Sequence, residues 1–314
     1  MKPTADMLPI GTRCRVRVPA STSNLGPAFD SVGCAVSLVN TFTFEIQAPG
    51  TEPIVELGGQ RCAGIPANPR NLALTIARGF FERVGAEPPV LGMRAEIDIP
   101  SARGLGSSST AIVAGIVGAN ALLGAMMTRE ELLDVAVELE GHPDNVAPAL
   151  LGGMVISASE SRPLAYQRIA VHPDISYVFV VPDYEVRTAD ARRVLPSTIS
   201  LKDGIYNASR SPLMVLAMLT GDLSAFPGCL DDRFHQPWRK PLFKHYDELS
   251  NAAIKSGAAG FCVSGAGPTM LAICRKDRRD AVITGLSRAM GTLGLGGFVQ
   301  ELVPSSTGTT VEIL

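Results

Sequence analysis

A glycine-rich turn followed by three consecutive serines, Gly104-Leu105-Gly106-Ser107-Ser108-Ser109, is the stretch with the clearest chemical character. An apolar run ends before it at Ile99 and another follows it, which predicts a strand, a loop and then a helix. Glycines let the backbone approach a ligand, and the free N–H groups at a helix N-terminus favour an anion. Serine hydroxyls can donate to phosphate oxygens or ligate Mg²⁺. The stretch therefore indicates a phosphate site, with a serine-capped turn as the alternative.

Two common phosphate motifs are absent from this stretch. The Walker pattern G-x-x-x-x-G-K-[ST] does not occur, which excludes a P-loop NTPase. The dinucleotide pattern G-x-G-x-x-G does not occur either, and no acidic residue follows at dinucleotide spacing. The glycine–serine loop by itself therefore leaves the class of phosphate ligand open.

Glu140 is the carboxylate whose position in the sequence is most informative. A capping box that starts at Thr128 predicts a helix ending at Glu140, just before Gly141. At about 100° per residue, Glu140 falls inside the apolar arc of this helix, whereas Glu138 lies on the solvent side. A carboxylate turned inward costs free energy unless it is paired or bound to a metal. Glu140 is therefore a candidate metal ligand, with a buried salt bridge as the alternative.

The elements that must position these residues alternate along the chain. Strand patterns occupy Thr12–Val18, Val36–Ile46, Val90–Ile97, Tyr177–Val181 and Thr269–Cys274, and helical spacing occupies Asn71–Val84 and Thr128–Glu140. Pro19–Asp30 is rich in Ser, Asn, Gly and Pro, so we expect a loop there. Because strands and helices alternate in both halves, the sequence predicts a mixed α and β class.

The composition describes a well-buried globular protein. Hydrophobic residues make up 46% and charged residues 18% of the 314 residues, enough for two modest domains or one large one. The net charge of −2, the absence of a charge block and the aromatic content of 5% argue against nucleic acid or an anionic membrane surface as a partner. Six scattered cysteines without a Cys-x-x-Cys pair, and no signal-peptide pattern over Met1–Ile10, favour a cytoplasmic protein.

One apolar segment raises the question of a membrane span. Thr110–Met127 is 18 residues long and uncharged, which is the lower limit for a membrane-crossing helix. It contains three glycines, Asn120 and five alanines, and no basic cluster flanks it closely. A helix of small residues can pack tightly on several sides, so we expect a buried core helix and no membrane contact.

Three separated motifs resemble the GHMP small-molecule kinases. The motifs are VPASTSNLGPAFDSVG (Val18–Gly33), IPSARGLGSSSTA (Ile99–Ala111) and VSGAGPTMLAI (Val263–Ile273). The second resembles the phosphate loop of that family, and the third resembles the glycine turn that supports its active site. A fourth segment, EGHPDNVAPALLGG (Glu140–Gly153), resembles the homoserine-phosphorylating branch in particular. Ala28, Ser109 and Thr110 depart from the glycine and alanines that are more usual in the family.

The resemblance implies an α+β fold in two parts. An ATP-binding domain of ribosomal-protein-S5-domain-2-like type would occupy residues 1–160, and a ferredoxin-like domain would occupy residues 161–314. The implied reaction is ATP-dependent transfer of a phosphoryl group to the side-chain hydroxyl of L-homoserine, a step of threonine biosynthesis, with Mg²⁺ as the metal. The sequence does not give the oligomeric state, and a homodimer is the expectation.

The resemblance also assigns residues to the nucleotide and its metal. Ser108 and Glu140 would hold Mg²⁺ between the β- and γ-phosphates, which agrees with the inward position of Glu140. The other nucleotide contacts would come from the phosphate loop, namely Ser101, Ala102, Arg103, Gly104, Leu105, Gly106, Ser107 and Ser109. Asn71 lies where the family contacts adenine, and a helix N-cap is the alternative role for this residue.

A homoserine pocket needs opposite charges close together, because this amino acid carries an ammonium and a carboxylate. Asp30 is expected to bind the ammonium, with Asn24 beside it. Arg192 and Arg239 match the two substrate arginines of the family, and Thr188 matches a residue of the same substrate loop as Arg192. Two guanidiniums suit a carboxylate because each can bind it through a fork.

His142 and Asn145 are expected near the substrate hydroxyl. Asn145 would orient that hydroxyl, and Asn145, Glu140 and Ser108 are the predicted catalytic residues. Positioning and electrostatic stabilisation dominate phosphoryl transfer, and no general base is assigned.

The alternatives are a related kinase for threonine or mevalonate, and a nucleotide-binding regulator without catalysis. Asp30 argues against mevalonate, which has no ammonium. The predicted catalytic residues argue against a regulator.

Overall fold

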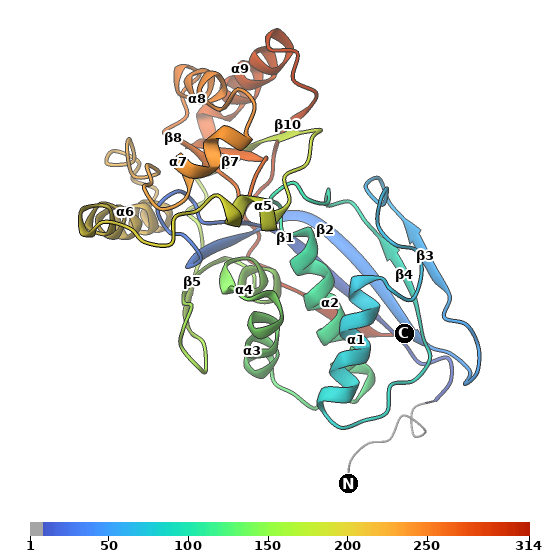
Figure 1. Cartoon of the computed structure of the whole chain (residues 1–314). Coiled ribbons are helices and arrows are strands. Elements are labelled where there is room, and N and C mark those ends of the chain that lie inside the picture. The colour runs from blue at the N-terminus through green and yellow to red at the C-terminus, as the bar shows by residue number, and fades with distance from the viewer. Residues whose placement is uncertain (1–8) are drawn as a thin grey trace.

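Two sheets form the framework of the chain in the computed structural model, which describes residues 9–314 (Figure 1). The strands are β1 (Arg13–Ser23), β2 (Val32–Ile46), β3 (Val55–Gly58), β4 (Leu91–Glu96), β5 (Met154–Ala158), β6 (Ala165–Ile169), β7 (Ile175–Pro182), β8 (Gly260–Val263), β9 (Met270–Arg275), β10 (Gly297–Glu301) and β11 (Thr310–Ile313). The helices are α1 (Leu72–Arg83), α2 (Ser107–Leu122), α3 (Arg129–Glu140), α4 (Pro143–Leu151), α5 (Thr188–Arg193), α6 (Leu201–Thr220), α7 (Gln236–Arg239), α8 (Tyr246–Lys255) and α9 (Arg279–Thr292).

The first sheet follows the order β11-β1-β2-β4-β3, and β5 and β6 extend it from β2. The helices α1 to α4 cover one of its faces, with α2 and α4 packed directly against β1 and β2 (Figure 1). The side chains of Cys14, Val16 and Val18 alternate inward along β1 and are fully buried in the core beneath these helices. The alternation that predicted a half-buried strand is therefore confirmed.

The prediction of a loop over Pro19–Asp30 is wrong for its first five residues. β1 continues to Ser23 and pairs with β2 beyond a register shift between Pro19 and Ala20. Polar composition suggested a loop, but backbone pairing with a distant strand satisfies the same groups. The remaining residues form a turn in which Asn24 and Asp30 have positive φ angles.

The second sheet has the strand order β10-β7-β9-β8, and its neighbouring strands are antiparallel. In chain order the elements read strand, helices, two strands, helix and strand, which is the ferredoxin-like arrangement that was predicted. α8 and α9 cover one face through Leu249 and Leu286. The other face includes Tyr177. It packs on the C-terminal end of β1, on the N-terminal end of β2 and on α6. The α+β class and the two-part fold are confirmed.

The first sheet draws strands from both halves of the chain. β6 and β11 both lie after residue 160, yet β6 pairs with β5, and β11 pairs with β1. The division into residues 1–160 and 161–314 stays a prediction, and the chain crosses between the two sheets more than once.

Helix α2 is the buried core helix that the sequence predicted. Its side chains are buried nearly all round, because small residues let neighbours approach closely. A Cβ on Gly118 would lie 2.6 Å from the Phe44 ring, and one on Gly115 would lie 2.7 Å from the Ala73 carbonyl oxygen. Among residues 9–314, none of the helices has both the length and the hydrophobicity that a membrane crossing requires. Most of Met1–Ile10, where no signal peptide was predicted, lies outside the described residues.

Candidate active site

The three sequence motifs meet where the two sheets approach each other. The turn Ser264–Pro268 joins β8 to β9 and lies against the phosphate loop, since the Ser264 hydroxyl donates to the Gly104 carbonyl at 2.7 Å. The Ser264 Oγ also lies 2.8 Å from the Thr22 Oγ1, and the Gly265 N–H donates to the Ser23 carbonyl at 3.1 Å. The third motif is therefore hydrogen-bonded to the first two, as a turn that supports the predicted site would be.

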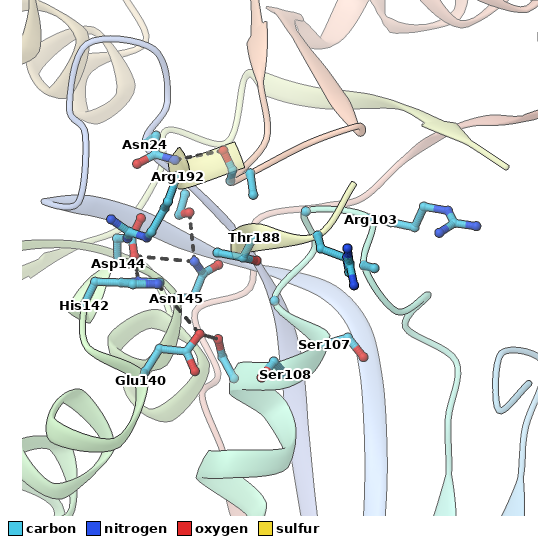
Figure 2. A pocket seen from close by; sticks show the side chains of 18 of the residues that line it. Asn24, Arg103, Ser107, Ser108, Glu140, His142, Asp144, Asn145, Thr188 and Arg192 are labelled. Carbon is cyan, nitrogen blue, oxygen red and sulfur yellow. Dashed lines mark hydrogen bonds and ion pairs between the residues drawn. The ribbon is translucent and has the colours of Figure 1, made fainter. Parts of the chain in front are cut away.

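A cavity of about 250 Å³ lies at this meeting point (Figure 2). Predicted site residues from all the motifs line it: Asn24, Asp30, Ala102, Arg103, Gly104, Gly106, Ser107, Ser108, Ser109, Glu140, His142, Asn145, Thr188, Arg192 and Arg239. The cavity is also lined by residues that the sequence did not single out, namely Ser23, Asp144, Arg187, Gly265 and Ala266. Gly265 and Ala266 belong to the third motif, and Arg187 directly precedes Thr188, so motif adjacency was the available signal.

A second cavity of about 290 Å³ adjoins the first and shares Ala102, Ser107 and Ser108 with it. Its walls are mainly apolar, with Phe42, Ile65 and Leu72 among them. Asn71 and Ser101 also line it, whereas neither is part of the first cavity. The two cavities are therefore neighbours that share part of the phosphate loop as a common wall.

Asn71 is a helix cap in the structure. Its Oδ1 accepts from the Ala73 N–H at 3.0 Å, which begins α1, and its Nδ2 donates to the Pro66 carbonyl at 2.9 Å. The alternative role given to Asn71 is therefore present, and an additional contact with adenine stays a prediction.

The phosphate loop ends at Gly106, which is the N-cap of α2 and has a φ of 71°. In the part of the chain that the structure describes, no side chain caps this helix end, and the first residues of α2 line the cavity. Leu105 is buried, and its carbonyl accepts from the Ser21 N–H at 3.2 Å, which fixes the loop from beneath. An uncapped helix N-terminus of this kind favours an anion, and the binding of phosphate here stays a prediction.

Arg103 joins the loop to the second sheet. Its Nε donates to the Pro182 carbonyl at 3.0 Å, and its Nη1 lies 3.2 Å from the Glu185 carboxylate. The Nη2 atom donates to the Asp183 carbonyl at 2.5 Å. The guanidinium thus holds the segment after β7 against the phosphate loop, and a nucleotide contact from Arg103 stays a prediction.

Glu140 points inward, as its position on the helix predicted. Its side chain is 13% exposed and accepts from the Ser109 hydroxyl at 2.9 Å. Burial raises the pKa of this carboxyl group, although His142 and the Ser109 hydrogen bond partly offset the effect. Glu138 lies on the other side of α3, with a 58% exposed side chain that pairs with Arg83 at 2.7 Å.

The two serines Ser108 and Ser109 at the start of α2 differ in their relation to Glu140. Ser109, which is buried, makes the hydrogen bond to Glu140, whereas Ser108 is exposed and lines the cavity (Figure 2). The sequence named Ser108 as the partner of Glu140 at the metal, and that pairing stays a prediction. A carboxylate and hydroxyls are hard oxygen donors, so the set suits Mg²⁺ better than a softer metal.

His142 lies between two carboxylates. Its Nδ1 is 2.5 Å from the Asp144 Oδ1, and its Nε2 is 3.9 Å from the Glu140 Oε1. Burial would lower the pKa of His142, but the hydrogen bond and charge of Asp144 and the charge of Glu140 outweigh it and raise the pKa. Figure 2 shows these three side chains along one wall of the cavity.

Asn145 is held in one orientation by two hydroxyls. Its Nδ2 donates to the Ser23 Oγ at 2.9 Å, and its Oδ1 accepts from the Ser21 Oγ at 3.0 Å. Both serines come from the end of β1, which the extension of that strand places here. The amide therefore lies between the phosphate loop and the acidic wall of the cavity, with a fixed direction.

Asp30 and Arg192 form a forked ion pair across the cavity. The Arg192 Nη1 and Nη2 donate to the two Asp30 carboxylate oxygens at 3.0 and 2.8 Å. Both side chains keep contact with solvent, at 25% exposure for Asp30 and 38% for Arg192. The residues predicted to bind opposite charges of an amino acid therefore satisfy each other here.

Asn24 acts on the backbone around this pair. Its Oδ1 accepts from the Asp30 N–H at 3.0 Å, and its Nδ2 donates to the Gly265 carbonyl at 3.0 Å. Asn24 thus fixes the turn that carries Asp30, and a direct substrate contact from Asn24 stays a prediction. Thr188, at the start of α5, lines the same cavity and is labelled in Figure 2.

Arg239 is almost completely buried at the inner end of the cavity. Its exposure is 2%, and its Nε and Nη1 donate to the carbonyls of Ala191 and Gly265, each at 3.1 Å. Burial, assisted by the nearby Arg192, lowers the pKa of Arg239 to about 10. The guanidinium therefore stays charged at neutral pH in a site with little water.

Comparison with known proteins identifies the family to which this chain belongs. Residues 71–153 match the family model described as the GHMP kinases N terminal domain, and residues 214–292 match the one described as GHMP kinases C terminal. A homoserine kinase of Synechococcus is 42% identical to the chain over 96% of it and 98% of the relative, and one of Moorella thermoacetica is 39% identical over 94% and 99%.

Solved structures agree with the sequence comparison. The crystal structure of homoserine kinase from Cytophaga hutchinsonii superposes with a TM-score of 0.85 at 27% identity, and the match covers 96% of this chain and 97% of that one. Mevalonate kinase from L. major has the same fold, with a TM-score of 0.70 at 17% identity over 98% and 100% of the two chains. The chain therefore belongs to the GHMP kinases, and its full-length likeness to several homoserine kinases places it in that branch of the family.

Proposed function

We propose that this kinase transfers the γ-phosphoryl group of ATP to the side-chain hydroxyl of L-homoserine, which gives O-phospho-L-homoserine. The observation that carries the proposal is the forked pair of Asp30 and Arg192. This pair lines the same cavity as Asn145 and the phosphate loop. An amino acid can exchange its two charges for those of the pair, because its ammonium replaces Arg192 at Asp30 and its carboxylate replaces Asp30 at Arg192.

The nucleotide occupies both cavities in this proposal. The apolar second cavity receives the adenine, and the N-terminus of α2 receives the phosphates. Residues Glu140, Ser108 and Ser109 offer oxygen donors that fit Mg²⁺, which would neutralise charge that develops on the phosphates. The burial of Glu140 with one hydroxyl partner supports a site built for a cation.

The acceptor is held by groups on the opposite wall. Arg239 joins Arg192 at the substrate carboxylate, and Asn145 orients the hydroxyl toward the γ-phosphorus. In the reaction, the hydroxyl oxygen forms the new P–O bond, the bond to the ADP oxygen breaks and the hydroxyl proton is released. Since the transition state spreads charge over the phosphoryl oxygens, the protein contributes by positioning and by fixed charges.

A panel of alcohols tests the substrate. With ATP and Mg²⁺, homoserine should give the highest kcat/KM for ADP release, threonine a lower one because its hydroxyl is secondary and one carbon nearer, and mevalonate none. Turnover with another alcohol but not with homoserine would refute the substrate assignment. Nucleotide binding without turnover of any alcohol would favour the regulator.

The phosphate loop gives a separate prediction. Gly106→Ala should weaken ATP binding about 10-fold, because a Cβ would lie 2.3 Å from the Ser21 Oγ on a backbone with a φ of +71°. The measurement is calorimetric titration with ATP in the absence of amino acid. Gly124→Ala is the control, because Gly124 has a φ of +79° and no atom within 4 Å of its Cβ position. Equal ATP affinity in both folded variants would argue against the proposed cradle.

The free cysteines support a reducing compartment. All six cysteines lie within the described residues and are free thiols. A cytoplasmic location is accordingly part of the proposal. The homodimer stays a prediction from the resemblance.

A further inference from the structure

We propose that His235 is a positioning residue that orients the Arg239 guanidinium toward the substrate carboxylate. His235 lies immediately before α7, is completely buried and has no part in the reaction described above. The inference rests on the proposed function, because it gives Arg239 the task of binding that carboxylate.

The ring nitrogens of His235 have different partners, and the partners determine the tautomer. The Nε2 lies 2.8 Å from the Gly26 carbonyl oxygen, which can only accept, so Nε2 carries the proton. The Nδ1 then has a free lone pair, and it lies 3.3 Å from the Arg239 Nη1, which can only donate. His235 is therefore neutral and accepts a hydrogen bond from the arginine.

The position of the ring is set from both sides. Its face stacks on Phe29 with ring centroids 5.2 Å apart, and the Arg239 guanidinium also lies 5.2 Å from the Phe29 centroid. The Asp232 carboxylate accepts a hydrogen bond from the backbone N–H of His235 at 2.8 Å, which fixes the backbone at this residue. Burial and the charge of Arg239 lower the pKa of His235, whereas the charges of Asp232 and Asp30 raise it. The net effect is a lowered pKa, which agrees with a neutral ring.

The hydrogen bonds of Arg239 leave one part of the guanidinium available. Its Nε and Nη1 are bound to the carbonyls of Ala191 and Gly265 and to His235. Within residues 9–314, no acceptor is bonded to Nη2, and Arg239 lines the active-site cavity. The contact with His235 fixes the rotation of the guanidinium plane, so that Nη2 remains available to an acceptor in the cavity.

Two substitutions at His235 separate its two contacts. In His235→Gln the amide nitrogen takes the place of Nε2 and keeps the Gly26 contact, whereas the acceptor for Arg239 is lost. In His235→Asn the amide oxygen takes the place of Nδ1 and keeps the acceptor, whereas the Gly26 contact is lost. We expect KM for homoserine to rise about 10-fold in His235→Gln and less than two-fold in His235→Asn, with KM for ATP unchanged in both.

The outcome is read on folded protein, with thermal unfolding of both variants as a control. A rise in KM for homoserine in His235→Asn that equals or exceeds that in His235→Gln would overturn the proposal. If only one variant folds, its KM for homoserine is compared with that of wild type. A normal KM for homoserine in His235→Gln contradicts the assigned contacts, and so does a raised KM in His235→Asn.

Arg239→Lys separates the failure of this inference from that of the proposed function. If Arg239→Lys leaves KM for homoserine unchanged, the carboxylate assignment itself fails. If Arg239→Lys raises it and His235→Gln does not, only the role of His235 fails. Because the two residues act as one unit here, His235→Gln should add less than two-fold to KM in the Arg239→Lys background.

Discussion

Replacing Glu140 by glutamine should lower kcat for homoserine by roughly 10²- to 10³-fold, the range seen when one preorganised charge-stabilising group is removed. The carboxylate is 13% exposed and lies beside the N-terminus of α2, where the proposed metal and phosphates meet. The amide keeps the shape and the Ser109 hydrogen bond but removes the negative charge. The measurement is kcat at saturating ATP, Mg²⁺ and homoserine.

Glu138→Gln is the matched control, because it makes the same chemical change two residues earlier on the same helix. Glu138 is 58% exposed and pairs with Arg83 on the outer side of α3. We expect its kcat to stay within two-fold of wild type. Similar losses of kcat in the two variants would show that the inward position of Glu140 has no catalytic meaning.

The stability of Glu140→Gln should change in the opposite direction to its activity. Burial raises the pKa of Glu140 in the folded protein, so the folded state disfavours its charged form. The wild type therefore loses stability as pH rises from the unfolded-state pKa through the folded-state pKa. Without ligands, the variant should melt at a higher temperature than wild type at neutral pH, and the difference should vanish at acid pH. A lower melting temperature at neutral pH would contradict this expectation, because it would mean that the charged Glu140 stabilises the folded protein.

Arg192→Lys should reduce kcat/KM for homoserine roughly 10- to 150-fold, which corresponds to about 1.5–3 kcal/mol for part of a charge-assisted contact. Lysine keeps the charge but cannot form the fork that Arg192 makes with Asp30 and is proposed to make with the substrate carboxylate. ATP affinity without homoserine should hardly change, because the residue binds only the acceptor in the proposal.

The comparison that identifies the carboxylate uses two substrates and two enzymes. The amide of homoserine should be a poor substrate of wild type, and Arg192→Lys should harm it much less than it harms homoserine. Arg193→Lys is the control, since Arg193 is the next residue of α5, is 76% exposed and pairs with Asp190. Equal fractional losses for acid and amide would mean that Arg192 does not bind the carboxylate.

Local patterns in the sequence predicted the local structure well. The alternation in β1 and the capping box of α3 depend on neighbouring residues, and both are found in the structure. The inward position of Glu140 follows from the same helix geometry. The ferredoxin-like order of the second sheet came only from the resemblance to a family, because periodicity does not determine which strands pair.

Contacts between distant segments were beyond the reach of those patterns. The end of β1 is a strand because it pairs with residues of β2, and its polar composition had suggested a loop. Asp30 and Arg192 are 162 residues apart in sequence, so their mutual pairing could not be read from either motif. His235 and Gly26 are 209 residues apart, which explains why the sequence did not identify His235 as part of the site.

The pairing of β11 with β1 has a consequence for how the chain reaches its final structure. Residues Cys14–Arg17 are synthesised long before their partners Thr310–Ile313, because nearly the whole of both sheets lies between them in the sequence. During synthesis, one edge of β1 therefore waits with unpaired backbone groups until the second sheet has been translated, and such an edge can pair with another chain. Completion of the first sheet is thus a late, non-local event, and it couples the folding of the two halves in time as well as in space.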